Sequence, residues 1–241
     1  MAGVVKVFHS WRCVSDAVVA ALSEPTADPF VRPILVAPGN AQSRSLLQSL
    51  ARRHGIAAGI DTTTPLGLRE RLEEDLLGIK RENDPWQPGP LALRICRIIE
   101  NNSPGFEVVS AHLEASRRQG VPRATWTTAR QAADAICALA RDSHDVLNAW
   151  ADGAAPTSHQ GDTDLAGDPL DPARAWWAPL WRTLLAKPCH VPDPVSRHQL
   201  LVDAILTQSR SEPPIVWFSS TTTAQHDVSL AEALSASHDV T

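Results

Sequence analysis

Four arginines gather around a short turn between two segments with helical apolar spacing. Arg117 and Arg118 lie before a Gly-Val-Pro sequence, Arg123 directly follows it, and Arg130 lies two helical turns further on. A guanidinium group is a planar fork that keeps its charge and matches the oxygens of a phosphate. We expect these side chains to contact phosphates along a single nucleic-acid strand, which gives affinity rather than choice of sequence. A solvated basic loop is the alternative interpretation.

A second group of polar residues follows two of the predicted strands. Small, amide and hydroxyl side chains come shortly after the apolar run 34–36 and again after Asp61. Such side chains can form hydrogen bonds with bases, whereas an arginine beside them would bind phosphate. The predicted DNA-binding positions of this group are Gly39, Asn40, Gln42, Arg44, Thr63 and Thr64.

The elements that carry these residues alternate between strands and helices. Apolar, β-rich runs predict strands at 4–8, 34–37, 57–60 and 215–218. Strand and helix alternation at this spacing indicates a parallel sheet with right-handed crossovers. The carboxyl ends of neighbouring parallel strands share one edge, so we expect the two polar turns to lie together there. Helices are predicted through Val14 to Leu22 with Ser10 as N-cap, from Ala41 to Arg53 with Gly55 as C-cap, between Pro65 and Leu76, and from Asp227 to Ser235.

The middle of the chain has helical spacing only. Helices are predicted at 90–100, 106–116 and 124–150, from residue 173 onwards, and at 196–208. Between them, residues 151–172 contain five Asp and no Lys or Arg, which predicts a flexible acidic loop.

The predicted fold class is therefore α/β, with a parallel sheet flanked by helices and an all-helical insertion lobe. We expect residues 1–85 and 211–241 to form the α/β lobe and residues 86–210 to form the insertion. A strand also begins at 238–240, which indicates a piece of a longer protein.

The residues that enzymes of this fold class use are missing from the sequence. A P-loop needs a lysine followed by Ser or Thr after a glycine-rich turn, and none of Lys6, Lys80 and Lys187 has that setting. Gly-x-Gly-x-x-Gly, Gly-x-Ser-x-Gly and His-Glu-x-x-His motifs are absent, and the four cysteines lie far apart. We therefore expect no catalytic residues, no cofactor and no metal site.

Composition sets the broad class. The chain has 241 residues, of which 43% are hydrophobic, and a net charge of −5, which argues against a general basic coat but leaves room for a local basic groove. Its apolar runs are too short to cross a bilayer, and no signal peptide is evident, so we expect a cytoplasmic protein without membrane contact.

Eight tryptophans accompany no tyrosine at all. Trp176, Trp177 and Trp181 have helical spacing, so packing in a core or an interface is their expected role. Stacking on unpaired bases is a possibility better suited to the tryptophans near the starts of predicted segments. These are Trp11, Trp86 and Trp126.

Several runs, in order along the chain, resemble the N-terminal region of the RecC family, the gamma subunits of exodeoxyribonuclease V. They are Val5–Ser10, Asp28–Phe30 with Ile34–Val36, Gly55–Asp61, Gln131–Asp134, Ala175–Trp181 and Val216–Ser219. Two segments depart from the family pattern: the turn after Val36 and the three threonines after Asp61.

The resemblance implies a helicase-like fold, with P-loop-type topology but without the P-loop, that has lost ATP hydrolysis. It also implies RecB-like and RecD-like partner subunits and single-stranded DNA at duplex ends, with the 3′ strand scanned for the Chi octamer. The function expected on this basis is that of a non-catalytic, DNA-guiding scaffold in double-strand break repair. The alternative is a protein-interaction module with no DNA role.

Overall fold

A computed structural model describes residues 9–24, 28, 30–101, 105–153, 176–187, 189–207, 213–219 and 224–237. The chain divides into two compact units, one of residues 1–80 with 199–241 and one of residues 81–198. The strands predicted at 4–8 and 238–240 and most of the acidic loop lie outside the described residues. The division into an α/β lobe of residues 1–85 and 211–241 and an insertion lobe of residues 86–210 stays a prediction.

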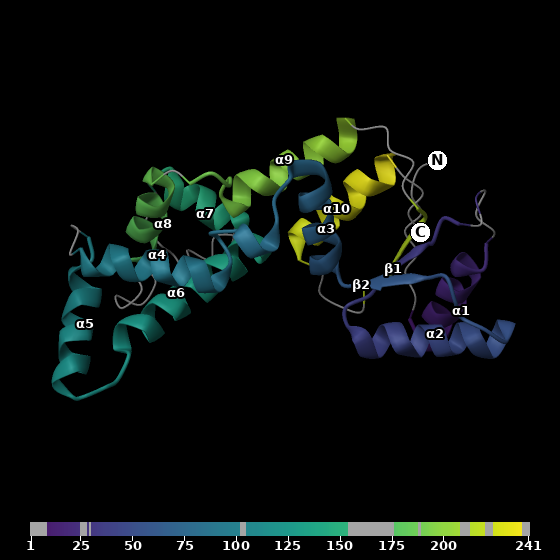
Figure 1. The fold of residues 1–241 in the computed structure, drawn as a ribbon, viewed down its shortest axis with the longest axis horizontal. Helices are drawn as coiled ribbons and strands as arrows, with labels where there is room; N and C mark the ends of the chain where they lie inside the picture. The colour runs from purple at the N-terminus through teal and green to yellow at the C-terminus, as the bar shows by residue number, and fades with distance from the viewer. Residues whose placement is uncertain are drawn as a thin grey trace. The chain divides into compact units, whose positions relative to one another are not determined.

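A small parallel sheet forms the centre of the first unit (Figure 1). Its strands are β1 (Ile34–Val36), β2 (Asp61–Thr63) and β3 (Ile215–Trp217), in the spatial order β2-β1-β3. Ile34 pairs with Asp61 on one side and with Ile215 on the other. All three β1 residues are buried, as expected for a central strand covered on both faces. The predicted α/β class with a parallel sheet is confirmed.

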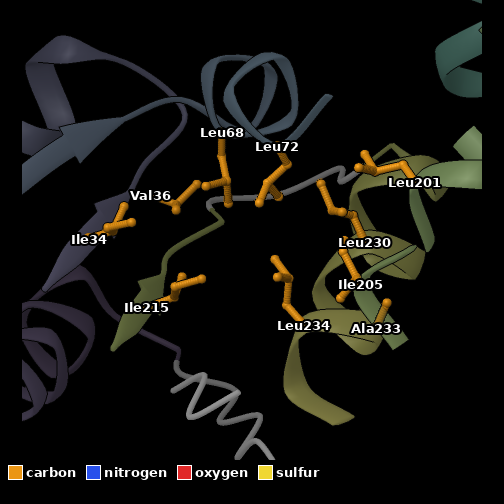
Figure 2. Close-up of a cluster of buried hydrophobic side chains, with 10 residues drawn as sticks. All are labelled: Ile34, Val36, Leu68, Leu72, Leu201, Ile205, Ile215, Leu230, Ala233 and Leu234. Atoms are coloured by element: carbon orange, nitrogen blue, oxygen red, sulfur yellow. The ribbon is translucent and has the colours of Figure 1, made fainter. Parts of the chain in front are cut away.

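Helices cover both faces of this sheet (Figure 1). On one face lie α1 (Trp11–Leu22) and α2 (Asn40–His54), which pack on Leu35 and Val216. The other face is covered by α3 (Pro65–Leu77), α10 (Gln225–Ser237) and the end of α9 (Pro194–Thr207). Figure 2 shows the ten buried side chains of this second layer, which include Ile34 and Val36 from the sheet. Successive strand residues therefore face opposite helical layers, as the pleat requires.

The strand predicted at 57–60 is wrong, because the paired strand begins at Asp61, directly after the predicted one. Gly59 has a φ of 73°, a left-handed conformation that cannot continue a strand. Pairing starts where the Asp61 amide donates to the Pro33 carbonyl at 3.0 Å. Ala57 and Ile60 are apolar because they pack against the α1–α2 layer, not because they belong to the sheet.

The described residues of the second unit form helices and no strand. They include a short 3-10 helix, η1 (Arg81–Asn83), and the helices α4 (Pro88–Glu100), α5 (Glu107–Arg118), α6 (Ala124–Asp142), α7 (His144–Ala151) and α8 (Trp177–Ala186), with the start of α9. The single helix predicted at 124–150 is wrong. It breaks at Ser143, whose φ of −154° and ψ of 56° lie outside the helical region, so α6 and α7 are separate.

Tryptophans fill the core of this unit. Trp86 and Trp181 lie with ring centroids 5.7 Å apart, and the Trp86 indole donates to the Val191 carbonyl at 3.2 Å. Trp176 and Trp181 are buried, which confirms the packing role predicted for them. Trp86 is only 4% exposed, so the alternative of base stacking is wrong for this residue. No helix among the described residues is long and apolar enough to cross a membrane.

Candidate nucleic-acid interface

The polar turns after β1 and β2 meet at one edge of the sheet. The Ala37 amide, one residue past β1, donates to the carbonyl of Thr63, the last residue of β2, at 3.0 Å. On the other side of β1, the Phe218 amide donates to the Val36 carbonyl at 2.8 Å. We call this the carboxyl edge and assign to it the five predicted positions Gly39, Asn40, Gln42, Thr63 and Thr64. Loops at such an edge are where open α/β sheets bind ligands.

The turn after β1 opens directly into α2. Gly39 is the N-cap, in an extended conformation, and no side chain caps the first turn. A Cβ at Gly39 would come within 3.2 Å of Gln42 Oε1, so glycine lets the Gln42 amide fold back over the turn. Asn40 and Arg44 are exposed, and α2 has no acidic residue in its first turn. The positive end of the helix dipole is therefore not neutralised by a carboxylate of its own helix.

The threonines after β2 form hydrogen bonds within the turn that starts α3. Thr64 is the N-cap, and its Oγ1 accepts from the Gly67 amide at 3.1 Å. Thr63 Oγ1 donates to the Thr64 carbonyl at 3.3 Å. Sequence analysis assigned both hydroxyls to DNA and missed the cap, although Pro65 directly after Thr64 is the usual signal for a helix start. The Thr64 hydroxyl can still donate its proton while its oxygen accepts.

The four predicted arginines lie at the α5–α6 hairpin. Arg117 and Arg118 occupy the last turn of α5, where positive charge stabilises the helix dipole. Arg118 lies 3.8 Å from Glu114, and Arg130 Nε lies 3.0 Å from Asp134 Oδ1, both on exposed surface. Exposed pairs of this kind are worth about 0–1 kcal/mol, so these guanidinium groups remain accessible to a ligand.

Arg123 occupies an unfavourable position at the start of α6. It is the N-cap, with a φ of 58°, and it is the only non-glycine residue of the described ranges with positive φ. Such a conformation costs on the order of 1–2 kcal/mol for a residue with a Cβ. A cation at a helix N-terminus is also repelled by the dipole. Packing does not require this arginine, because its side chain is exposed.

The structure thus places the ten predicted positions in two groups. Arg44 follows the carboxyl-edge turn on α2, in the first unit, whereas the arginines of the α5–α6 hairpin belong to the second unit. A common channel that joins the two groups remains a prediction.

Sequence analysis missed an ion pair in the first unit. Arg69 Nη2 on α3 lies 2.8 Å from Asp227 Oδ1 in the first turn of α10, and the side chains are 11% and 14% exposed. The pair joins the first half of α3 to the first turn of α10. No local signal could have revealed it, because the two residues are far apart in the sequence.

Metal-ligating and thiol side chains are dispersed in the part of the chain that the structure describes. No set of three His, Cys, Asp or Glu side chains there could hold a metal ion, and the four cysteines are free. Burial raises the pKa of the Cys137 thiol to about 11, and its Sγ donates to the Trp86 carbonyl at 3.5 Å. At neutral pH this thiol is protonated, and a thiol is a weak nucleophile.

A parallel α/β unit with a helical unit inserted between its second and third strands defines the class of protein. The family described as "RecC, N-terminal domain" matches residues 8–241, and the chain belongs to this family. It is 29% identical over 251 residues to the RecBCD enzyme subunit RecC of Mycobacterium tuberculosis, which covers 94% of this chain and 20% of that protein. The RecC subunit of Mycolicibacterium smegmatis is 25% identical over 238 residues, covering 94% of this chain and 19% of that protein. The chain therefore spans about a fifth of the length of the curated relatives it matches.

Proposed function

We propose that this chain is a non-catalytic, DNA-guiding and scaffolding part of a cytoplasmic RecBCD-type complex that processes DNA ends in recombinational repair. The observation that carries the proposal is the family match over nearly the whole chain. The relatives are RecC subunits of RecBCD enzymes, and a RecC-like chain would assemble with RecB-like and RecD-like subunits.

The proposed fold is helicase-like, with the P-loop missing. A buried strand, a turn and a helix (β1, Gly39 and α2) follow one another in the order found at a phosphate-binding loop. The turn holds one glycine and no lysine, so it lacks the charge that neutralises the β- and γ-phosphates of a nucleotide. The proposal therefore assigns ATP-dependent chemistry to other subunits of the exodeoxyribonuclease V complex.

The proposed contact with the 3′ single strand uses both groups of polar residues. The exposed arginines of the α5–α6 hairpin supply positive charge for phosphates, in a chain whose net charge is −5. The carboxyl edge supplies amide and hydroxyl groups that can choose among bases. The most specific element of the proposed function is that these carboxyl-edge groups take part in recognition of Chi.

The second candidate is a protein-interaction module without a DNA role. Large apolar side chains on the surface favour it, among them Ile56, which is 68% exposed, and Leu93, which is 56% exposed. Single exposed apolar side chains are common on protein surfaces, and only contiguous apolar patches mark contact sites.

The two candidates are separated by measuring binding of a fluorescent single strand to the full-length protein, alone and with the subunits that co-purify with it. The proposed function predicts binding that weakens steeply with salt, because phosphate contacts release counterions. Co-purification of partner subunits without any single-strand binding, at any salt concentration, supports the second candidate instead.

A further inference from the structure

An exposed tryptophan lies between two arginines on one flank of α6. Trp126 and Arg130 are four residues apart on α6, a spacing that makes them neighbours on the helix surface, and Arg123 is the N-cap one turn before Trp126. Ala129 and Ala133 are buried, whereas the side chains of Arg123, Trp126 and Arg130, at the border of this buried face, are exposed. We call these three residues the α6 stripe.

Trp126 is not held by the interactions that hold the other tryptophans. Trp86, Trp150 and Trp181 are at most 4% exposed, whereas Trp126 is 38% exposed. Trp11 is 44% exposed, but its ring lies edge-on to Phe218 with centroids 5.4 Å apart. Within the described part of the chain, the Trp126 indole makes no aromatic ring contact and no hydrogen bond. Part of its indole is therefore open to a ligand.

The arginines beside Trp126 indicate that such a ligand carries negative charge. Arg123 is exposed at the helix start despite an unfavourable backbone conformation and an unfavourable dipole. Arg130 uses Nε to contact both carboxylate oxygens of Asp134, each at 3.0 Å, which holds its guanidinium in place and leaves the Nη groups outside this contact. Arg130 offsets the negative charge of Asp134, which lies one turn further along α6.

We infer that Trp126 is a stacking platform for one unpaired base, and that Arg123 and Arg130 contact the phosphates on either side of that base. The inference rests on the proposed function and adds a residue and a mode of binding to it. Along α6, the two arginines lie about 4.5 Å and about 6 Å from Trp126 in axial rise. A base in a single strand likewise has one phosphate before it and one after it. Aromatic stacking beside cations is how single strands are bound without strong choice of sequence.

The test combines protein variants with a strand that lacks single bases. Binding of a 3′-tailed duplex to the full-length protein is measured for the parent, Trp126→Ala and Trp126→Phe, with Phe30→Ala as the control for loss of an exposed aromatic side chain. Each protein is also tested on a series of tails with an abasic site at successive positions. Circular dichroism and Tm of each variant check that it folds.

The expected result is a roughly 5- to 150-fold weaker Kd for Trp126→Ala, with much of the affinity restored in Trp126→Phe and little change in Phe30→Ala. For the parent, one abasic position should weaken binding by a similar factor. The same abasic tail should have little further effect on Trp126→Ala, because both changes remove the same stacked pair.

The outcomes separate this inference from the proposed function. If the parent binds the tail but Trp126→Ala binds equally well, or if every abasic position has the same effect on both proteins, the stacking role is wrong and the DNA-guiding function stands. If the parent does not bind the tail at all, the proposed function itself is wrong. Loss of partner co-purification in Trp126→Ala, with unchanged DNA binding, would assign the stripe to an acidic protein surface and overturn the inference.

Discussion

Arg197 and Asp84 form a buried, bidentate ion pair. Nη1 and Nη2 of Arg197 each lie 2.9 Å from one carboxylate oxygen of Asp84, and the side chains are 7% and 3% exposed. Asp84 follows η1, where the chain begins the second unit, and Arg197 lies in the first turn of α9, where the chain leaves it. Asp84 also accepts from the Trp86 amide at 2.9 Å. The pair therefore ties together the two ends of the helical unit.

Arg197→Ala should lower the free energy of unfolding by about 3–5 kcal/mol, because it leaves the Asp84 carboxylate buried without a partner. Urea unfolding followed by circular dichroism measures this change. The double variant Asp84→Asn, Arg197→Met should recover at least half of the loss, since it leaves no buried charge. Arg130→Ala is the matched control, because its exposed pair should contribute less than about 1 kcal/mol. Equal effects of Arg197→Ala and Arg130→Ala would contradict the buried pair.

Stability should fall at high pH because of Cys137. Burial raises the pKa of this thiol from its ordinary value of 9.0 to about 11. The protonated thiol therefore stabilises the fold fully below pH 9, and this contribution is lost as the pH rises towards 11. Between these two pH values the parent should lose on the order of 2 kcal/mol more than Cys137→Ala. Chemical denaturation at a series of pH values, with Cys13→Ala as the exposed control, checks this. Parallel curves for the parent and Cys137→Ala would show that the thiol is not buried.

Thr64 should prove to have a structural role as well as its proposed DNA role. Thr64→Ala removes the hydroxyl that caps α3 and should cost about 1 kcal/mol, whereas Thr64→Ser keeps the cap and should cost much less. Thermal unfolding measures both. Any change in base preference should be sought in Asn40→Ala, which removes an amide expected to contact bases and leaves the α3 cap intact. A Thr64→Ala variant as stable as the parent would show that another group caps the helix.

The arginines of the α5–α6 hairpin should control the salt dependence of DNA binding. Replacing Arg117, Arg118 and Arg123 with Ala should weaken binding to a single strand and flatten its salt dependence, because each lost phosphate contact releases about 0.7 fewer counterions. The plot of log Kd against log salt measures this. The triple variant of Arg52, Arg53 and Arg71 removes the same charge from exposed positions of the first unit and should leave the slope nearly unchanged. Equal slopes for the parent and the first triple variant would exclude the hairpin as a phosphate contact.

The chain should not hydrolyse ATP. It has three lysines, and none of them follows a glycine-rich turn and precedes Ser or Thr. Purified chain should show no magnesium-dependent ATP turnover above background and no shift of Tm with ATP. Turnover that disappears in Lys6→Ala or Lys80→Ala would contradict this reading of the sequence.

Local signals predicted much of the fold. The Ser10 and Gly55 caps, the strands near 34–36 and 215–217, and most helices follow from patterns within a few residues, and the structure has them. The two wrong elements share one cause. The apolar residues at 57–60 and the helical spacing across Ser143 correctly predicted side chains that pack against a core. The same pattern does not show where the backbone leaves the strand or helix conformation, which happens at Gly59 and Ser143.

Contacts between distant residues could not be predicted in the same way. The ion pairs Arg69–Asp227 and Asp84–Arg197 cannot be predicted from the residues that surround either partner in the sequence. The meeting of the two polar turns could be anticipated, because the carboxyl ends of parallel strands share an edge whatever the side chains are.

The sheet also sets an order of events during synthesis on the ribosome. Ile34 in β1 pairs with Ile215 in β3, and most of the chain lies between them. Until β3 emerges, β1 has a partner on one side only and presents an unpaired edge. The intervening residues 81–198 are continuous in sequence, so they can complete their own core first. Once the Asp84–Arg197 ion pair has formed, the folded insertion replaces a long flexible loop between β1 and β3. The loss of chain entropy when β3 pairs with β1 is then much smaller.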